Sequence, residues 1–371
     1  MTTRLQAAPT VPTSARSGRW LTTPSGSLLA SWSSASLSFL FTGEKLVLAV
    51  GGTTERKDKS NGGTPMIAIL TGASEDAALG NTESWRSFDP DPNSEVVIFN
   101  KGTRQEKTYV RIVLIDWAST FELEAFLVDE AASIEPLPST GDKQIPHILV
   151  IGDSISSGMA VSVDQGGEPI PFGVLNTFPF VAQRILREDK GSGLECSVEL
   201  VGYPGYNLVR PTEEEKEKAG YCNGMAEGFF WDSPWSKDRL TDAPTPFPTA
   251  VIIELGTNDQ FFKVSSERFG SGLIELVSSL KKWYDGSFRH VWLVPPFPDA
   301  DTDNRELNEA MPTFIPLLEA QFGGGISFKV VDLVEGLTTA NTVDGVHPPL
   351  AVHVDLGKKL AGFIASNLPS I

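Results

Sequence analysis

The sequence predicts an antiparallel β-sandwich followed by a three-layer α/β/α unit with about five parallel strands. Two observations predict this fold class. In the first third of the chain, short alternating apolar runs are broken by Gly, Pro, Asn and Asp, as in antiparallel strands joined by turns. From residue 145 onward, strand-like runs alternate with helical patterns, which is typical of a parallel sheet covered on both faces.

The first part of the chain divides into an arm, a sandwich and a linker. Residues 1–18 are rich in Thr, Ser, Ala and Pro and have no period, so we expect a loose arm. Residues 19–133 form the predicted sandwich domain, and residues 134–144 contain two prolines and a turn cluster typical of a linker. Strands are expected in the sandwich over residues 36–41, 45–50, 66–70, 95–99, 108–115 and 121–128.

Residues 145–371 form the predicted α/β domain. In an open α/β sheet the functional groups lie on loops at the carboxyl ends of the strands, so the loops that follow strands are the places to search for a site. Strands are expected over residues 147–151, 197–201, 250–255, 290–294 and 327–331. Helices are expected over residues 178–188, 265–284, 304–322 and 350–367.

Composition excludes several classes of partner. The 371 residues carry a formal net charge of −17, which would repel nucleic acid and an anionic membrane surface. The two cysteines cannot build a disulfide framework and their spacing fits no zinc pattern, and four histidines leave few metal ligands. We therefore expect no metal and no cofactor.

Targeting signals are also missing from the chain as given. The first 20 residues lack the apolar core of a secretory signal, and no apolar run of 18 residues occurs. There is no Asn-x-Ser/Thr acceptor site for glycosylation. We expect a cytoplasmic protein with no membrane partner, or a secreted one if a signal was removed earlier.

The first candidate site residue is Ser154. It follows the β-branched run 148–151 in the sequence Gly152-Asp153-Ser154, so it stands at the carboxyl end of a buried strand. Small neighbours allow a tight turn to present its hydroxyl as a nucleophile. The alternative is an ordinary turn that caps the next helix.

Two further candidate site segments follow predicted strands. Gly205, after the second strand, can bring its backbone N–H close to a ligand. Asn258, after the third, can donate its side-chain amide to a developing oxyanion. Both residues also fit ordinary turns, and Asn258 also fits a helix cap or an Asx turn.

The fourth candidate site segment, before the last predicted helix, contains Asp344 and His347. Their spacing of three residues lets the carboxylate hold the imidazole in the tautomer that a serine nucleophile needs. His147 and His290 precede strands and so belong at the opposite end of the sheet, and His353 lies within the final helix. His347 is therefore the candidate general base.

Together, Gly152-Asp153-Ser154, Gly205, Gly256-Thr257-Asn258-Asp259 and Asp344-x-x-His347-Pro348 resemble the four blocks of the SGNH (GDSL) hydrolase superfamily. The resemblance covers residues 145–371 and implies a flavodoxin-like fold. It implies Ser154 as nucleophile, His347 as base and Asp344 as its orienter. It also implies an oxyanion hole made by the N–H groups of Ser154 and Gly205 and by the Asn258 amide.

The preceding sandwich resembles the jelly-roll-like domain of carbohydrate esterase family 2. Residues 31–41, SWSSASLSFLF, are similar to its first strand pair, and Tyr203-Pro204-Gly205 is similar to its second block. This resemblance implies an esterase that removes acetyl groups from carbohydrate, with acetylated carbohydrate as its partner. The alternatives are a lipase or thioesterase of the same superfamily and, in another class, a non-catalytic carbohydrate-binding protein.

Substrate binding is assigned to four residues near these blocks. The long insert over residues 210–248 concentrates aromatic side chains just before the third block, where sugar rings could stack. Alternatively, the aromatic side chains of the insert fill a small core of their own. The assigned residues are Asp153, Tyr206, Trp231 and Trp235.

Overall fold

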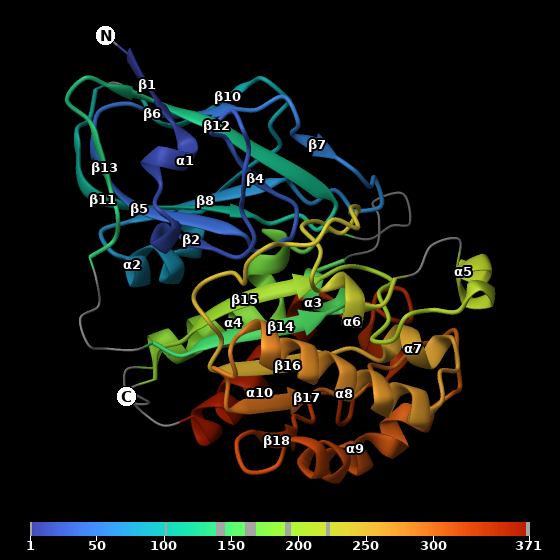
Figure 1. The fold of residues 1–371 in the computed structure, drawn as a ribbon. Coiled ribbons are helices and arrows are strands. Elements are labelled where there is room, and N and C mark those ends of the chain that lie inside the picture. Colours follow the sequence, from blue (N-terminus) through green and yellow to red (C-terminus); the bar gives the residue numbers. More distant parts are fainter. Residues whose placement is uncertain are drawn as a thin grey trace.

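The computed structural model describes residues 2–100, 102–138, 145–159, 168–189, 194–219 and 223–368. Two antiparallel sheets and one parallel sheet with helices on both faces confirm the predicted fold class. Figure 1 shows the antiparallel sheets stacked above the parallel one. The chain therefore has two layers of all-β structure followed by three layers of α/β structure.

The two antiparallel sheets pack face to face around a core of aliphatic and aromatic side chains. The ring centroids of Phe39 and Phe126, one from each sheet, lie 5.4 Å apart. The larger sheet contains β1 (Thr2–Gln6), β3 (Leu21–Thr22), β4 (Leu28–Ala30), β6 (Leu46–Val50), β7 (Glu55–Arg56), β10 (Glu95–Phe99) and β12 (Ser119–Asp129). The smaller sheet contains β2 (Arg16–Ser17), β5 (Ser36–Gly43), β8 (Ile67–Gly72), β9 (Arg86–Phe88), β11 (Gln105–Leu114) and β13 (Ser133–Glu135). The six predicted strands are β5, β6, β8, β10, β11 and β12.

The prediction of a loose arm over residues 1–18 was wrong. β1 pairs antiparallel with β12, from Thr2 opposite Asp129 to Gln6 opposite Ala125, and α1 (Ala7–Thr10) follows it. The residues of β1 are mostly exposed and do not alternate in polarity, so backbone pairing with β12 makes this segment a strand. In the predicted linker, β13 pairs with β5, and residues 139–144 lie outside the described residues.

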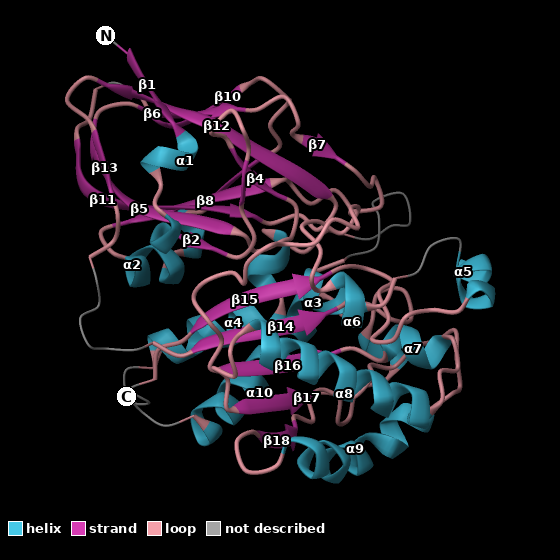
Figure 2. Cartoon of the chain, in the orientation of Figure 1, coloured by secondary structure: helices cyan, strands magenta, loops and turns pink. Residues whose placement is uncertain are grey.

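The parallel sheet has the strand order β15-β14-β16-β17-β18. Its strands are β14 (His147–Gly152), β15 (Ser197–Gly202), β16 (Ala250–Glu254), β17 (His290–Leu293) and β18 (Ser327–Val330). Its long helices are α4 (Phe178–Glu188), α8 (Ser266–Trp283), α9 (Glu306–Phe322) and α10 (Leu350–Asn367), which Figure 2 shows around the sheet. All of these elements agree with the predicted ones to within a few residues.

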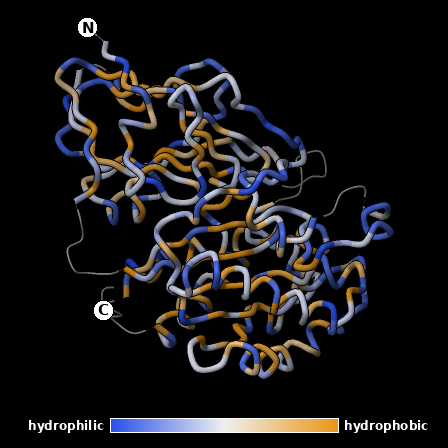
Figure 3. Tube along the Cα trace, in the orientation of Figure 1, coloured by the Kyte–Doolittle hydropathy of each residue, from blue (hydrophilic) through white to orange (hydrophobic). Residues whose placement is uncertain are grey.

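Alternation along β14 divides the core between the two faces of the sheet. Ile148 and Val150 share a core with α4 and α10, whereas Leu149 and Ile151 share a core with α8 and α9. Figure 3 shows the hydrophobic segments running along these strands and between the antiparallel sheets. Both faces of the sheet are covered, so the ends of its strands are left for function.

Short helices follow or flank the carboxyl ends of the strands. They are α3 (Ser154–Ser157), α5 (Glu213–Ala219), α6 (Met225–Gly228) and α7 (Thr257–Phe261), and α2 (Glu75–Gly80) lies in the sandwich. In Figure 1 the arrowheads of β14 and β15 point toward α3, α6 and α7. Three of the four predicted blocks therefore lie at one edge of the sheet.

Candidate functional site

Ser154 begins α3 directly after β14. Asp153 caps this helix, because its Oδ1 accepts the N–H of Ile155 at 3.0 Å, and Gly158 ends it in the left-handed conformation at φ 78°. Ser154 is 7% exposed. The serine is therefore largely buried in this turn.

His347 and Asp344 form a hydrogen-bonded pair. The imidazole Nδ1 lies 2.6 Å from Asp344 Oδ2, and Asp344 Oδ1 accepts the N–H groups of Val346 and His347. Burial raises the pKa of Asp344, but the hydrogen bond and charge of His347, with these N–H groups, outweigh burial and lower the pKa to about 2. An ionised Asp344 can only accept the hydrogen bond from Nδ1–H, so Nε2 is left as the basic nitrogen.

The imidazole of His347 lies within electrostatic range of the Ser154 turn. A positive charge on it opposes the burial that raises the pKa of Asp153, the residue just before Ser154, and adds to the burial that lowers the pKa of His353. Among the described residues there is no hydrogen bond between the Ser154 hydroxyl and His347. Contacts between nucleophile and base are often long before substrate binds, so the missing hydrogen bond does not exclude His347 as the base.

Asn258 connects the Ser154 turn to the loop that contains Gly205. Its Nδ2 donates to Asp153 Oδ2 at 3.2 Å and to the carbonyl oxygen of Tyr206 at 3.1 Å. Gly205 has φ 76°, a conformation that disfavours other residues. The hydrogen bonds thus bring together three of the four blocks that the sequence predicted to meet. Both amide protons of Asn258 are donated in these bonds.

Three buried carboxyl groups lie behind this edge. Burial raises the pKa of Asp153 to about 6, against the opposing effects of the Ile155 N–H, the His347 charge and the Asn258 amide. Burial raises the pKa of Asp259 to about 7, although it accepts the N–H groups of Leu208 and Val209. Such perturbed groups concentrate at functional sites.

The third buried carboxyl, Glu254, was not among the predicted residues. Burial, and next the neighbouring Asp153, raise its pKa well above the usual value. It pairs in register with Gly152, where a Cβ atom would lie only 2.6 Å from Glu254 Oε2, so the glycine makes room for this side chain. An acidic residue that ends a β-branched apolar run was the available signal in the sequence.

The assignment of four substrate-binding residues needs correction. Asp153, Tyr206 and Trp231 are buried, so their side chains do not face a ligand from solvent. Tyr206 and Trp231 belong to the core shared with α8, which is the alternative in which the insert fills a core. Only Trp235, at 36% exposed, can offer its ring to solvent.

Trp235 lies beside the Gly205 loop. Its Nε1 donates to the Tyr203 hydroxyl at 3.1 Å, and the two rings meet edge to face at 5.7 Å. Tyr203 directly follows β15. The ring of Trp235 is therefore held at the same edge of the sheet as Ser154.

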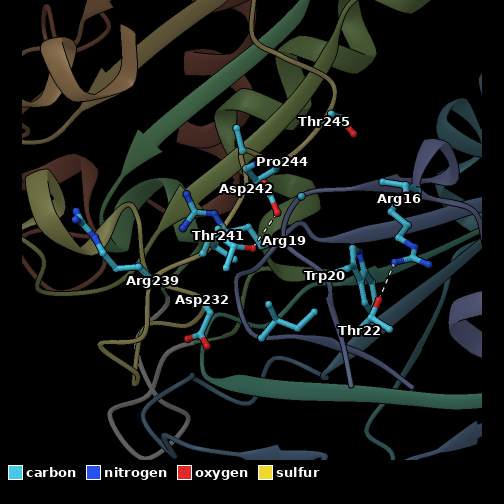
Figure 4. Close-up of a pocket in the computed structure, with 15 residues that line it drawn as sticks. Arg16, Arg19, Trp20, Thr22, Asp232, Arg239, Thr241, Asp242, Pro244 and Thr245 are labelled. Atoms are coloured by element: carbon cyan, nitrogen blue, oxygen red, sulfur yellow. Dashed lines mark hydrogen bonds between the residues drawn. The ribbon is translucent and has the colours of Figure 1, made fainter. Parts of the chain in front are cut away.

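A separate hollow of about 530 Å³ lies between residues 13–22 and the insert over residues 232–245 (Figure 4). Its lining includes Arg19, Trp20, Arg239 and Asp242, and none of the residues assigned to catalysis. Among the described residues, no group of three or more His, Cys, Asp or Glu side chains is arranged to hold a metal ion. In the part of the chain that the structure describes, no helix is both long and apolar enough to cross a bilayer.

Comparisons with known proteins establish the fold. No protein-family model and no curated protein matches the sequence. A family two carbohydrate esterase from Cellvibrio japonicus superposes with a TM-score of 0.71 at 16% identity, over 99% of this chain and 98% of that one. An acetyl xylan esterase from the rumen bacterium Butyrivibrio proteoclasticus gives 0.66 at 14%, over 99% and 98%.

A third structure with this fold has a different activity in its name. A salicylyl-acyltransferase from a tetracycline biosynthetic pathway superposes with a TM-score of 0.62 at 12% identity, over 100% of this chain and 99% of that one. The predicted resemblance to carbohydrate esterase family 2 is thus confirmed at the level of the fold. One fold can carry several chemistries, so function has to be argued from the site.

Proposed function

We propose that this chain is a metal-independent serine esterase that hydrolyses acetyl esters on carbohydrate. The observation that supports it most directly is the 2.6 Å pair of His347 and Asp344, whose imidazole lies within electrostatic range of the turn of Ser154. A pure binding protein has no need of this pair. The fold shared with carbohydrate esterases supports carbohydrate as the substrate class.

The mechanism follows from the three side chains. Ser154 Oγ attacks the ester carbonyl while His347 Nε2 takes its proton, and Asp344 stabilises the imidazolium. The N–H groups of Ser154 and Gly205 stabilise the oxyanion. Asn258 joins them when the oxyanion replaces Asp153 or Tyr206 as the acceptor of one of its two amide protons. When the tetrahedral intermediate collapses, the sugar hydroxyl leaves with the proton from His347, and a water activated by His347 then releases acetate.

The proposed acyl group is small. An acetyl xylan esterase is among the structures that share this fold, and this likeness supports acetyl over a long acyl chain. Rates on 4-nitrophenyl acetate, butyrate and octanoate should therefore fall with chain length. The reverse order would favour the alternative, a lipase or thioesterase.

The test is acetate release from 4-nitrophenyl acetate and acetylated xylan by the wild type and by Ser154→Ala. We expect kcat to fall by at least ~10³-fold in the variant, with its melting temperature unchanged. Equal rates in the two proteins would rule out the mechanism. Adding an alcohol acceptor and analysing the products distinguishes hydrolysis from acyl transfer.

A further inference from the structure

The β-sandwich contacts the edge strand of the parallel sheet that leads to Gly205. This strand, β15, ends the sheet on the side of the sandwich (Figure 1). The Ser34 hydroxyl lies 3.0 Å from the N–H of Leu200, whose proton it accepts, and 3.4 Å from the carbonyl oxygen of Leu200. Ser34 has φ 72°, an uncommon conformation for a serine, so the sandwich accepts local strain where it covers this edge.

Two tryptophans of the sandwich contact both ends of the Gly205 loop. Trp117 meets Tyr203 edge to face, with ring centroids 5.5 Å apart, and Trp32 meets Tyr206 in the same way at 6.5 Å. Both tryptophans are at most 2% exposed. Gly205 lies between the two tyrosines, so its position depends on packing from the sandwich.

The Gly205 loop is hydrogen-bonded onward to the Ser154 turn. The carbonyl oxygen of Tyr206 accepts from Asn258 Nδ2, which also donates to Asp153 Oδ2. Asp153 in turn caps the helix that Ser154 begins. A continuous path of contacts therefore runs from Trp32, through Tyr206 and Asn258, to the Ser154 turn.

We propose that Trp32 and Trp117 are positioning residues for the oxyanion hole, so that the β-sandwich is a working part of the esterase. This proposal rests on the proposed function. The tryptophans touch neither Ser154 nor His347. They pack against the loop that carries the Gly205 N–H, one oxyanion donor. In the same loop the carbonyl oxygen of Tyr206 accepts from Asn258, another donor. A misplacement of about 1 Å in such donors costs ~10²-fold in rate.

A third tryptophan of the sandwich provides the matched control. Trp85 is 5% exposed and meets Phe172 edge to face at 5.4 Å, and its Nε1 donates to the carbonyl oxygen of Ala78. It belongs to the core shared with α4 and α10, whereas Trp32 and Trp117 belong to the core shared with α8. Truncating any of the three leaves a comparable cavity.

The experiment compares Trp32→Ala, Trp117→Ala and Trp85→Ala in the full chain. The measurements are kcat and KM on 4-nitrophenyl acetate, the rate of inactivation by a fluorophosphonate, and the melting temperature. All rates are measured below the lowest melting temperature of the set. We expect all three variants to melt earlier than the wild type.

Only Trp32→Ala and Trp117→Ala should lower kcat, by about 10- to 100-fold, with KM changed less than about threefold. The conservative variants Trp32→Phe and Trp117→Phe should recover most of this loss, because a phenyl ring still packs against the tyrosine. If the two alanine variants lose no more kcat than Trp85→Ala, the proposal is overturned.

Variants that fail to fold are replaced by phenylalanine variants. If an alanine variant does not fold, Trp32→Phe and Trp117→Phe are compared with Trp85→Phe, and we expect a two- to fivefold loss of kcat in the first two and none in the third. Equal kcat in all three would overturn the proposal. Failure of the proposed function itself is recognised separately, because Ser154→Ala would then match the wild type.

Discussion

Buried acidic groups at the two ends of the parallel sheet differ in their ion-pair partners. At the amino end, the buried Glu199 has a basic partner, because its Oε2 lies 3.2 Å from His147 Nε2. At the carboxyl end, Asp153, Glu254 and Asp259 are all buried, and among the described residues none forms an ion pair with a lysine or arginine. Burial without a lysine or arginine partner disfavours the charged form, so the pKa values of these three carboxyl groups are raised at the end of the sheet where the proposed chemistry takes place.

The largest expected effect separates two histidines at opposite ends of the sheet. His347→Ala should lower kcat on 4-nitrophenyl acetate by at least ~10³-fold, because no other group takes the proton of Ser154. His147→Ala, which removes a buried imidazole from the amino end, should lower the melting temperature but leave kcat within about threefold. Similar losses of kcat in both variants would contradict the claim that only the carboxyl end of the sheet takes part in catalysis.

A smaller effect is expected at Asp344. Asp344→Ala should retain about 10 to 100 times more activity than His347→Ala, because the imidazole keeps its basic nitrogen but loses its orientation. Steady-state kinetics across pH 5 to 9 measure this difference. Activity in Asp344→Ala as low as in His347→Ala would show that orientation matters as much as the base.

The buried carboxyl groups should also affect stability in a pH-dependent way. Because the pKa of Glu254 is raised in the folded state, the folded protein holds a proton that the unfolded chain has lost, and stability falls as pH rises above ~4.5. Glu254→Gln cannot titrate, so its melting temperature relative to the wild type should rise between pH 5 and pH 8. Each pKa unit corresponds to ~1.4 kcal/mol of unfolding free energy.

The control for this prediction is Glu199→Gln at the other end of the sheet. This change weakens the contact with His147, so the melting temperature should fall at both pH values. If the melting temperatures of Glu254→Gln and the wild type differ by the same amount at pH 5 and pH 8, the pKa of Glu254 is not raised in the folded state. Thermal unfolding followed by circular dichroism is sufficient for both variants.

The smallest expected effect concerns Trp235. Trp235→Ala should raise KM for acetylated xylan by about 2- to 10-fold, the loss expected for one aromatic contact, and leave KM for 4-nitrophenyl acetate unchanged. Phe247, 40% exposed in the same insert, is the control, because its ring packs on Tyr284, whereas the ring of Trp235 packs on Tyr203. An equal rise of this KM in Phe247→Ala would mean that Trp235 does not contact the substrate specifically.

The sequence predicted the long elements well because their signals are local. β14 and α4 agree with their predicted bounds to within one residue, since a β-branched run and an amphipathic period need no distant partner to be recognised. β1 was missed because its strand conformation comes from pairing with β12, which lies 119 to 127 residues away in the sequence. Its own sequence, TTRLQ, carries no alternation.

At the site, the sequence predicted which blocks meet but not which rings are buried. Asn258 contacts both the Asp153 turn and the Gly205 loop, as the order of strands implied. Tyr206 and Trp231 are covered by Trp32 and other distant residues, so their burial depends on packing between parts far apart in sequence. The contacts of Trp32 and Trp117 with Tyr206 and Tyr203 could not be predicted for the same reason.

The most direct test of the central claim is covalent labelling of Ser154. A fluorophosphonate probe should add its mass to the peptide that contains Ser154 in the wild type, and much more slowly in His347→Ala, because the hydroxyl is nucleophilic only when a base takes its proton. The absence of an adduct on this peptide, or an adduct on another serine that forms equally fast in Ser154→Ala, would contradict the account.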